Sequence, residues 1–150
     1  MLVAGGLGMP GLWRFCKLGK SDVTLVWGAR TKAQFFPLAL PKKVRYIRVT
    51  EDGSLGQKGL ATEVAEKLMD AEGAPDVVYS CGPKAMLKEL AKICVKRGIR
   101  GQVLYEERMA CGIGACLGCA VPAKSGGYLR ACADGPAFWF DEIDWERVSW

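Results

Sequence analysis

"LVAGGLGMPGL", residues 2 to 12, places a short apolar run directly before a glycine-rich turn and a helix candidate. The turn contains the G-x-G-x-x-G pattern as Gly6, Gly8 and Gly11. A strand, a glycine turn and a helix in this order bring backbone N–H groups and a helix N-terminus to one point, where they can hold a pyrophosphate. Pro10 removes one of those donors. The alternative is a tight connection that binds no ligand.

Further apolar runs follow, and helix candidates lie between them. The runs lack strict alternation, as expected of strands covered on both faces. One helix candidate, residues 84–97, begins after Pro83 and ends before Gly98, which is the usual start and stop chemistry. This order predicts an α/β domain with a doubly wound parallel sheet and right-handed crossovers over residues 1–105. The strand candidates are residues 2–4, 23–27, 44–49, 76–80 and 102–106, the other helix candidates are 11–18 and 60–71, and one short helix is expected within 33–43.

Composition restricts the class of protein. The chain has 150 residues, half of them hydrophobic, which is enough to bury a core. Its 21 basic and 16 acidic residues are spread along the whole chain, so the net charge of +5 indicates a mildly basic surface and no nucleic-acid partner. No apolar run is long enough for a membrane span, and no basic segment opens a secretory signal. We expect a soluble, cytoplasmic protein. Because there is no histidine, any chemistry rests on cysteine, carboxylates or a cofactor.

The seven cysteines are unevenly placed. An odd number without an export signal predicts reduced thiols. Cys16 and Cys94 lie in apolar helical patterns and are expected in the core. From residue 106 onward the sequence changes to glycine, cysteine and brief strands, with a hairpin predicted from 119–124 and 128–132. We therefore predict that residues 106–150 form a second, small domain, which is too small to be stable without a staple such as a disulfide or a metal site.

Four of the cysteines provide that staple. Cys111, Cys116, Cys119 and Cys132 have the spacing C-x4-C-x2-C-x12-C. The first three match plant-type ligation of a [2Fe–2S] cluster, with the fourth arriving from a more distant element. The small residues between them allow the loop to curl with its N–H groups toward the sulfurs. A zinc site with four thiolates is the main rival, although it normally uses two closely spaced pairs. Four unmetallated thiols are the remaining alternative.

Two further positions lie where open α/β sheets bind ligands. "SCGPKAM", residues 80–86, follows the fourth strand at its carboxyl end, so Cys81 either touches a nicotinamide ring or is a buried thiol. "WGARTK", residues 27–32, follows the second strand and has no acid for a ribose hydroxyl. Arg30 there either holds phosphate or ribose or faces water. A single arginine does not decide between NADH and NADPH.

A resemblance to a known family rests on four motifs. "GGLGMPGL", "DVVYSCGPKAML", "EERMACGIGACLGCAV" and "ACADGPAF" occur in that order. They resemble the electron-transfer subunits of NAD-dependent dihydroorotate dehydrogenase, within the ferredoxin-reductase-like superfamily. The resemblance covers essentially the whole chain, and the cysteine segment is its most specific part. It predicts an NAD-binding domain followed by a small [2Fe–2S] domain.

The resemblance also implies roles for residues. Cys111, Cys116, Cys119 and Cys132 would ligate a [2Fe–2S] cluster. Gly5, Gly6 and Gly8 would approach the dinucleotide phosphates, and Cys81, Gly82 and Pro83 would lie near the nicotinamide. The chain would relay electrons between NAD(H), FAD and the cluster, to or from the FMN of a separate catalytic subunit in pyrimidine biosynthesis. Substrate and partner follow from the resemblance alone.

One difference from the family changes the activity that we expect of this chain. Its members carry a β-barrel domain that holds FAD ahead of the nucleotide domain, whereas Met1 here lies within the first strand. A hydride donates two electrons together and a [2Fe–2S] cluster accepts one, so a flavin must stand between them. We therefore predict an oxidoreductase subunit that is not catalytic alone, as a fragment or with FAD on a separate chain. Alternatives are a subunit of another NAD(P)H-linked oxidoreductase, such as a sulfide dehydrogenase, and a zinc-stapled regulatory module that binds a nucleotide.

Side chains around the cysteines suggest two further roles. Glu106, Glu107 and Arg108 either bias the reduction potential or are solvated surface charges. The apolar flank of Met109, Ile113 and Leu117, together with Trp139 and Phe140, either docks a catalytic partner or packs in the core.

Overall fold

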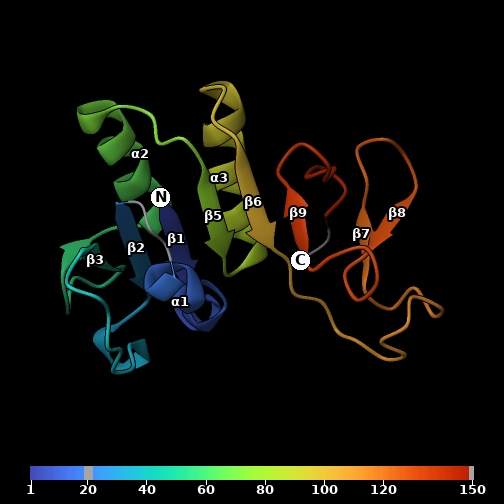
Figure 1. Cartoon of the computed structure of the whole chain (residues 1–150), viewed down its shortest axis with the longest axis horizontal. Coiled ribbons are helices and arrows are strands. Elements are labelled where there is room, and N and C mark those ends of the chain that lie inside the picture. Colours follow the sequence, from blue (N-terminus) through green and yellow to red (C-terminus); the bar gives the residue numbers. More distant parts are fainter. Residues whose placement is uncertain (19–21, 149–150) are drawn as a thin grey trace.

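A single seven-stranded sheet organises the protein (Figure 1). The computed structural model describes residues 1–18 and 22–148. Within these ranges the strand order is β4-β3-β2-β1-β5-β6-β9, and every neighbouring pair is parallel except β6 and β9. The predicted doubly wound α/β class is confirmed. The strands are β1 Leu2–Gly5, β2 Val23–Ala29, β3 Val44–Thr50, β4 Gln57–Lys58, β5 Val78–Cys81, β6 Gly101–Leu104 and β9 Ala137–Trp139.

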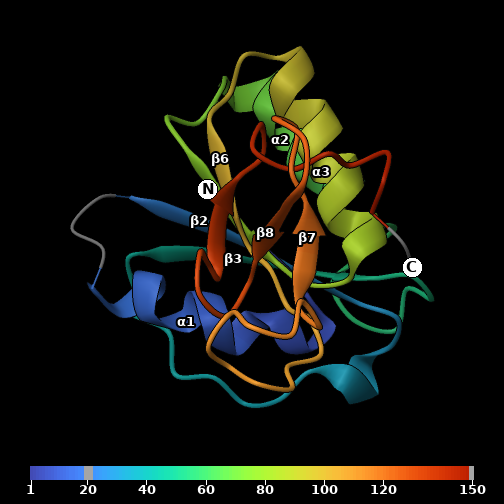
Figure 2. The same ribbon diagram turned by 90° about the vertical axis from the view of Figure 1, so that its right-hand side faces the viewer.

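Helices cover both faces of the sheet. The α-helices are α1 Met9–Leu18, α2 Ala61–Glu72 and α3 Lys84–Lys96, and short 3-10 helices occupy Gly6–Gly8 and Lys32–Gln34. Helix α1 lies on one face, and α2 and α3 lie on the other (Figure 2). Alternation along β1 explains this, because Leu2 and Ala4 join the core under α1 while Val3 joins the core under α2 and α3. Among the described helices, none combines the length and the apolar character that crossing a bilayer requires.

The structure matches most predicted elements and adds two strands. Helix α1 begins at Met9, two residues before the predicted start, because Pro10 is tolerated in the first turn of a helix. Strand β4 is too short to leave a sequence pattern. The sequence ADGPAF, residues 133–138, carries a glycine-proline turn signal, yet Ala137–Trp139 forms β9 and pairs with β6. Phe138 is 2% exposed, so burial of its ring outweighs the preceding Gly135-Pro136 turn signal.

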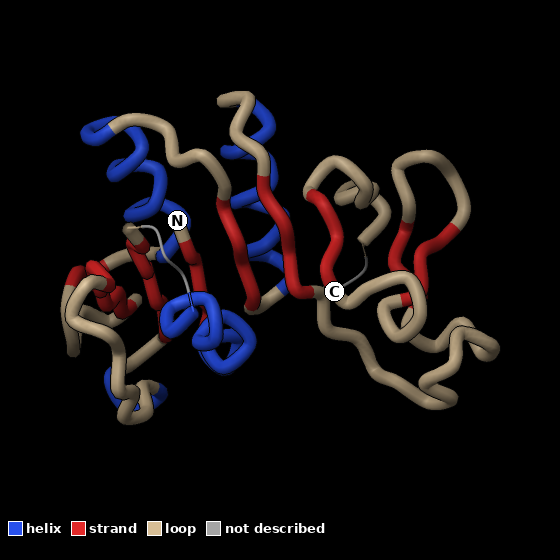
Figure 3. The backbone as a smooth tube through the Cα atoms, viewed as in Figure 1, coloured by secondary structure: helices blue, strands red, loops and turns tan. Residues whose placement is uncertain are grey.

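The C-terminal segment packs closely on the sheet. The predicted hairpin is present as β7 Ala120–Pro122 and β8 Tyr128–Arg130. Val121, Phe140 and Ile143 share one buried core with residues of α3 and β6. Figure 3 shows the loop after β6 running out from the carboxyl end of that strand before it returns to the hairpin. The division at residue 105 stays a prediction, and β9 ties the two parts together.

Candidate metal centre and nucleotide cleft

The glycine loop and the CGP turn meet between β1 and β5, where the strand order reverses. A Cβ atom added at Gly8 would lie 2.2 Å from the carbonyl oxygen of Cys81. One added at Gly5 would lie 2.6 Å from Cδ of Pro83. Gly8 is therefore required for close packing of two backbones, and Gly5 for close packing against the side chains of Pro83 and Met86. Gly6 differs, since its φ is +51° and no atom lies within 4 Å of the added Cβ.

A cleft of about 570 Å³ opens at the carboxyl ends of β1, β2 and β3. The N-termini of α2 and α3 form its opposite wall, so two helix dipoles point their positive ends toward it. Of the residues predicted to bind nucleotide, Gly5, Gly6, Arg30 and Pro83 line this cleft. Gly8, Cys81 and Gly82 do not line it and lie in the packed turn beside it.

Buried groups fix the shape of the cleft. The indole Nε1 of Trp27 donates to the carbonyl of Gly6 at 2.9 Å, and Trp27 is fully buried. The backbone N–H of Arg30 donates to Oε1 of Gln34 at 2.8 Å, which holds the end of β2 against the following short helix. Glu51, at the end of β3, is an acid on the same rim that the sequence analysis missed. A carboxylate there can accept hydrogen bonds from a ribose.

Cys81 is buried at the end of β5 and 2% exposed. Burial raises the pKa of its thiol to about 11, and the carboxylate of Glu106 adds to the rise. The Cys81 sulfur lies 3.9 Å from Oε1 of Glu106, the residue at which the cysteine segment begins. Cys81 is thus a neutral thiol at pH 7. Cys16 and Cys94 are also fully buried, as predicted.

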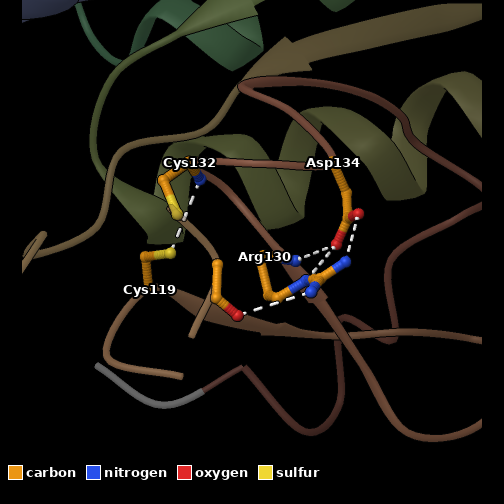
Figure 4. A network of polar contacts seen from close by, with 5 residues as sticks. Cys119, Arg130, Cys132 and Asp134 are labelled. Atoms are coloured by element: carbon orange, nitrogen blue, oxygen red, sulfur yellow. Dashed lines mark hydrogen bonds and ion pairs between the residues drawn. The ribbon is translucent and has the colours of Figure 1, made fainter. Parts of the chain in front are cut away.

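The four clustered cysteines form two pairs. The backbone N–H of Cys116 donates to the sulfur of Cys111, and that of Cys132 donates to the sulfur of Cys119. Figure 4 shows the second pair, with Cys132 at the end of the hairpin. The hairpin explains this pairing, because Ala120 lies opposite Arg130 in the β7–β8 ladder and the cysteines follow at its open end.

Backbone N–H groups surround the sulfurs. The amide of Cys116 donates to the sulfur of Cys111, that of Gly118 to Cys116, and that of Cys132 to Cys119, each at 3.4 Å. The amide of Ile113, followed by that of Cys116, lowers the pKa of the Cys111 thiol to about 6. The neighbouring Cys119 side chain, followed by burial, raises the pKa of Cys132. Donors aimed at sulfur stabilise thiolates, which are the form that binds metal.

The loop needs unusual backbone conformations to present these donors. Gly112 and Gly114 have φ of +68° and +81°. Leu117 has φ of +58° and is the one non-glycine residue with positive φ in the part of the chain that the structure describes. A leucine in the left-handed region costs about 1 kcal/mol, and such strain concentrates at functional sites.

This donor set fits a two-iron cluster. Each iron of a [2Fe–2S] cluster takes two of the four protein ligands, which corresponds to the two cysteine pairs. Across residues 1–18 and 22–148, no group of three or more Cys, Asp or Glu side chains is gathered as the ligands of one metal ion would be. The paired arrangement is the one that a two-iron site needs.

The apolar flank divides into two groups. Met109, Ile113 and Leu117 are 52%, 79% and 58% exposed, so they lie on the surface. Phe140 is 3% exposed and belongs to the core, and Trp139 is half-buried with the guanidinium of Arg100 over its ring at 4.3 Å. The carboxylate of Glu107 pairs with Lys84 at the start of α3, at 2.5 Å, and joins the cysteine segment to the nucleotide domain.

The ion pair of Arg130 and Asp134 was not predicted from the sequence. It flanks Cys132, and Figure 4 shows the two side chains facing each other beside the cysteines. The sequence offered one signal for this ion pair, because Arg130 and Asp134 carry opposite charges and lie on either side of the predicted ligand Cys132. The bidentate contact depends on a tight turn in which the N–H groups of Ala133 and Asp134 both donate to the carbonyl of Arg130.

Comparison with known proteins shows what this site is similar to. The model of the iron–sulfur cluster binding domain of dihydroorotate dehydrogenase B matches residues 106–144. An electron transfer subunit of dihydroorotate dehydrogenase B (NAD(+)) from Caldanaerobacter subterraneus is 40% identical over 146 residues. The chain resembles the electron transfer subunits of dihydroorotate dehydrogenase B. This confirms the resemblance that the motifs predicted.

Other matches agree. A probable dihydroorotate dehydrogenase B (NAD(+)) electron transfer subunit from Methanocaldococcus jannaschii is 36% identical and covers 98% of this chain. The chain spans 58% and 57% of the lengths of these two relatives. An NADH-dependent reduced ferredoxin-NADP oxidoreductase structure superposes with a TM-score of 0.83 at 30% identity, covering 98% of this chain and 54% of that one. A ferredoxin reductase of carbazole 1,9a-dioxygenase, at 18% identity and a TM-score of 0.54, shares the fold. The names of these matches mention an iron–sulfur cluster, NAD(+), NADH and flavin-based electron bifurcation.

Proposed function

We propose that the chain is an electron relay of a dihydroorotate dehydrogenase B, exchanging electrons between NAD(H) and the FMN of a separate catalytic subunit in pyrimidine biosynthesis. The observation that carries this proposal is the pairing of four cysteines within a ring of backbone N–H donors, in the domain matched at residues 106–144. The relatives' names mention dihydroorotate and NAD(+), and the FMN-containing partner is what the resemblance to these subunits implies. The thiolate ligands suit the reducing cytoplasm, where we place the protein.

The nucleotide half would bind NAD(H) in the cleft of about 570 Å³. Gly6 leaves open space on the loop, where the dinucleotide phosphates can approach the backbone. The N-termini of α2 and α3 favour that negative charge, and Arg30 adds a cation on the rim. Pro83 lies on the cleft wall, and we place the nicotinamide toward it and the Cys81–Gly82 turn.

The cysteine half would hold a [2Fe–2S] cluster through Cys111, Cys116, Cys119 and Cys132. The cluster supplies one-electron transfer when it is bound. The protein contributes thiolates that are stabilised by amide donors, and a loop whose glycines allow those amides to turn inward. Met109, Ile113 and Leu117 supply an exposed apolar surface around this loop for the catalytic subunit.

A flavin must join the two halves, since a hydride carries two electrons and the cluster accepts one. We place this FAD on another domain or another chain, in contact with the cleft. The two halves therefore bind NAD(H) and hold a cluster, and turnover depends on the flavin that joins them.

Anaerobic purification with iron and sulfide tests the central claim. The expected product is brown, absorbs visible light, bleaches with dithionite and gives a paramagnetic resonance signal when reduced. Serine variants of each of the four cysteines should lose iron, whereas Cys16→Ser, outside the loop, should retain it. A colourless sample with one bound zinc would refute the proposal and favour the nucleotide-binding module.

The structural comparison also supports a second electron-transfer partner. The structural match to an NADH-dependent reduced ferredoxin-NADP oxidoreductase favours ferredoxin as the one-electron partner instead of the FMN subunit. Native purification followed by mass spectrometry distinguishes the two. Recovery of an FMN-containing subunit supports the first function, and recovery of a ferredoxin or of a ferredoxin-oxidoreductase subunit supports the second.

A further inference from the structure

Arg130 is fixed beside the cysteines by its own neighbour. Its Nη2 and Nε donate to the two carboxylate oxygens of Asp134 at 2.8 and 2.9 Å, and its backbone N–H donates to the same carboxylate at 2.8 Å. Figure 4 shows the guanidinium between Asp134 and the loop. Because three contacts anchor the pair, the direction of the remaining nitrogen, Nη1, is defined.

That remaining nitrogen contacts the cysteine loop. Nη1 of Arg130 donates to the carbonyl oxygen of Gly114 at 3.4 Å. A Cβ added at Gly114 would lie 3.2 Å from Nη1 and 3.0 Å from Cβ of Ala133, so the loop packs directly on the arginine. Arg130 also lies close to the second cysteine pair along the hairpin, since it is opposite Ala120, the residue after Cys119, and two residues before Cys132.

Gly114 transmits this contact to two sulfurs. Its own N–H faces the sulfur of Cys132. Its carbonyl belongs to the peptide group whose N–H is that of Ala115, and this N–H lies near the sulfur of Cys111. A donor on the carbonyl of a peptide group polarises the N–H of the same group and strengthens its hydrogen bond. Arg130 therefore acts on Cys111 through one peptide unit and on Cys119 and Cys132 through space.

We propose that Arg130 and Asp134 set the reduction potential of the cluster in opposite directions, with Arg130 raising it and Asp134 lowering it. This inference rests on the proposed function, because it needs a cluster at the four cysteines. Reduction adds a negative charge to the cluster, so a cation and stronger N–H···S bonds stabilise the reduced form. Arg130 is a positioning residue, since it touches the loop and not the iron.

The test is a redox titration of the anaerobic, cluster-loaded chain, followed by visible absorbance and by the resonance signal of the reduced state. At the wild-type midpoint, Arg130→Gln should lower the ratio of reduced to oxidised cluster about tenfold, which is a fall of 59 mV for a one-electron couple. Asp134→Asn should raise the ratio. Arg130→Lys keeps the charge and should lie closer to the wild type than Arg130→Gln.

Two control variants change the same charges elsewhere in the small domain. Arg147 lies over the ring of Tyr128, at the other end of β8, and Asp141 follows β9. Arg147→Gln and Asp141→Asn should leave the ratio near the wild-type value. Because exposed charges are screened, raising the ionic strength should reduce the shifts at Arg130 and Asp134.

The outcomes separate this inference from the proposed function. If the wild type holds a cluster and both test variants shift in the same direction, or shift no more than the controls, the inference is overturned and the proposed function stands. If the wild type holds no cluster, both are overturned. If Arg130→Gln cannot retain iron, the sign of the Asp134→Asn shift decides, and a fall in the ratio overturns the inference.

Discussion

Replacing Gly8 by alanine tests whether packing against the CGP turn determines the conformation of the glycine loop. The new Cβ would lie 2.2 Å from the Cys81 carbonyl oxygen and 2.7 Å from the Gly82 nitrogen, and real Cβ atoms essentially never approach closer than 3.0 Å. Both obstructing groups are backbone, one at the end of β5 and one in the turn that follows it, so neither can rotate away. We expect a loss of about 3 kcal/mol, the upper end of the usual overpacking range.

Gly6→Ala is the matched comparison on the same loop. No atom lies within 4 Å of its added Cβ, so only the backbone conformation at φ +51° opposes the change. This costs about 1 kcal/mol. Because Gly6 lines the cleft, Gly6→Ala should reduce the free energy of NADH binding by more than it reduces the free energy of unfolding.

Urea unfolding, followed by tryptophan fluorescence and far-UV circular dichroism, measures both variants. With a denaturant slope of about 2 kcal/mol/M, the midpoint should fall by about 1.5 M for Gly8→Ala and by about 0.5 M for Gly6→Ala. Equal slopes would show that the native state remains compact. A larger loss of stability for Gly6→Ala than for Gly8→Ala would refute the reasoning.

Three other predictions follow from the fold. Phe138→Ala removes a ring that is 2% exposed between β6 and the hairpin, so it should cost about 3 kcal/mol in urea unfolding and lower the retained iron per chain; unchanged stability would contradict the role of β9. The pKa of Cys81 and of Cys94 is raised to about 11 by burial, so the folded chain keeps protons that the unfolded chain releases above the ordinary thiol value. The free energy of unfolding, measured by thermal unfolding, should therefore fall as pH rises from about 9 toward 11, by at most about 1.4 kcal/mol per pH unit for each thiol. Cys94→Ala should make this dependence on pH shallower, and an unchanged slope would contradict the prediction. Removing iron with a chelator should speed amide hydrogen exchange in residues 106–119 while β1, β2 and β5 stay protected, because that loop buries few apolar side chains; uniform exchange would argue against a locally stapled segment.

The sequence by itself determined the fold class and the cysteine set. Apolar runs separated by helical patterns predict a parallel sheet that helices cover on both faces. The glycine turn after the first run marks where that sheet begins. The C-x4-C-x2-C-x12-C spacing identified the four cysteines, because loop length between ligands is a property of the chain and not of its folding.

Only the tertiary structure decided which residues share the site. The two glycines at positions 6 and 8 look equivalent in sequence, yet the neighbouring CGP turn buries one and leaves the other on the cleft. Strand β9 was hidden behind a glycine-proline turn signal, since pairing with β6 depends on contacts remote in sequence. The reach of Arg130 to Gly114 likewise exists because the hairpin folds residue 130 back onto the cysteine loop. Local spacing records chemistry along the chain, whereas burial and long-range approach arise from packing free energy that no short pattern contains.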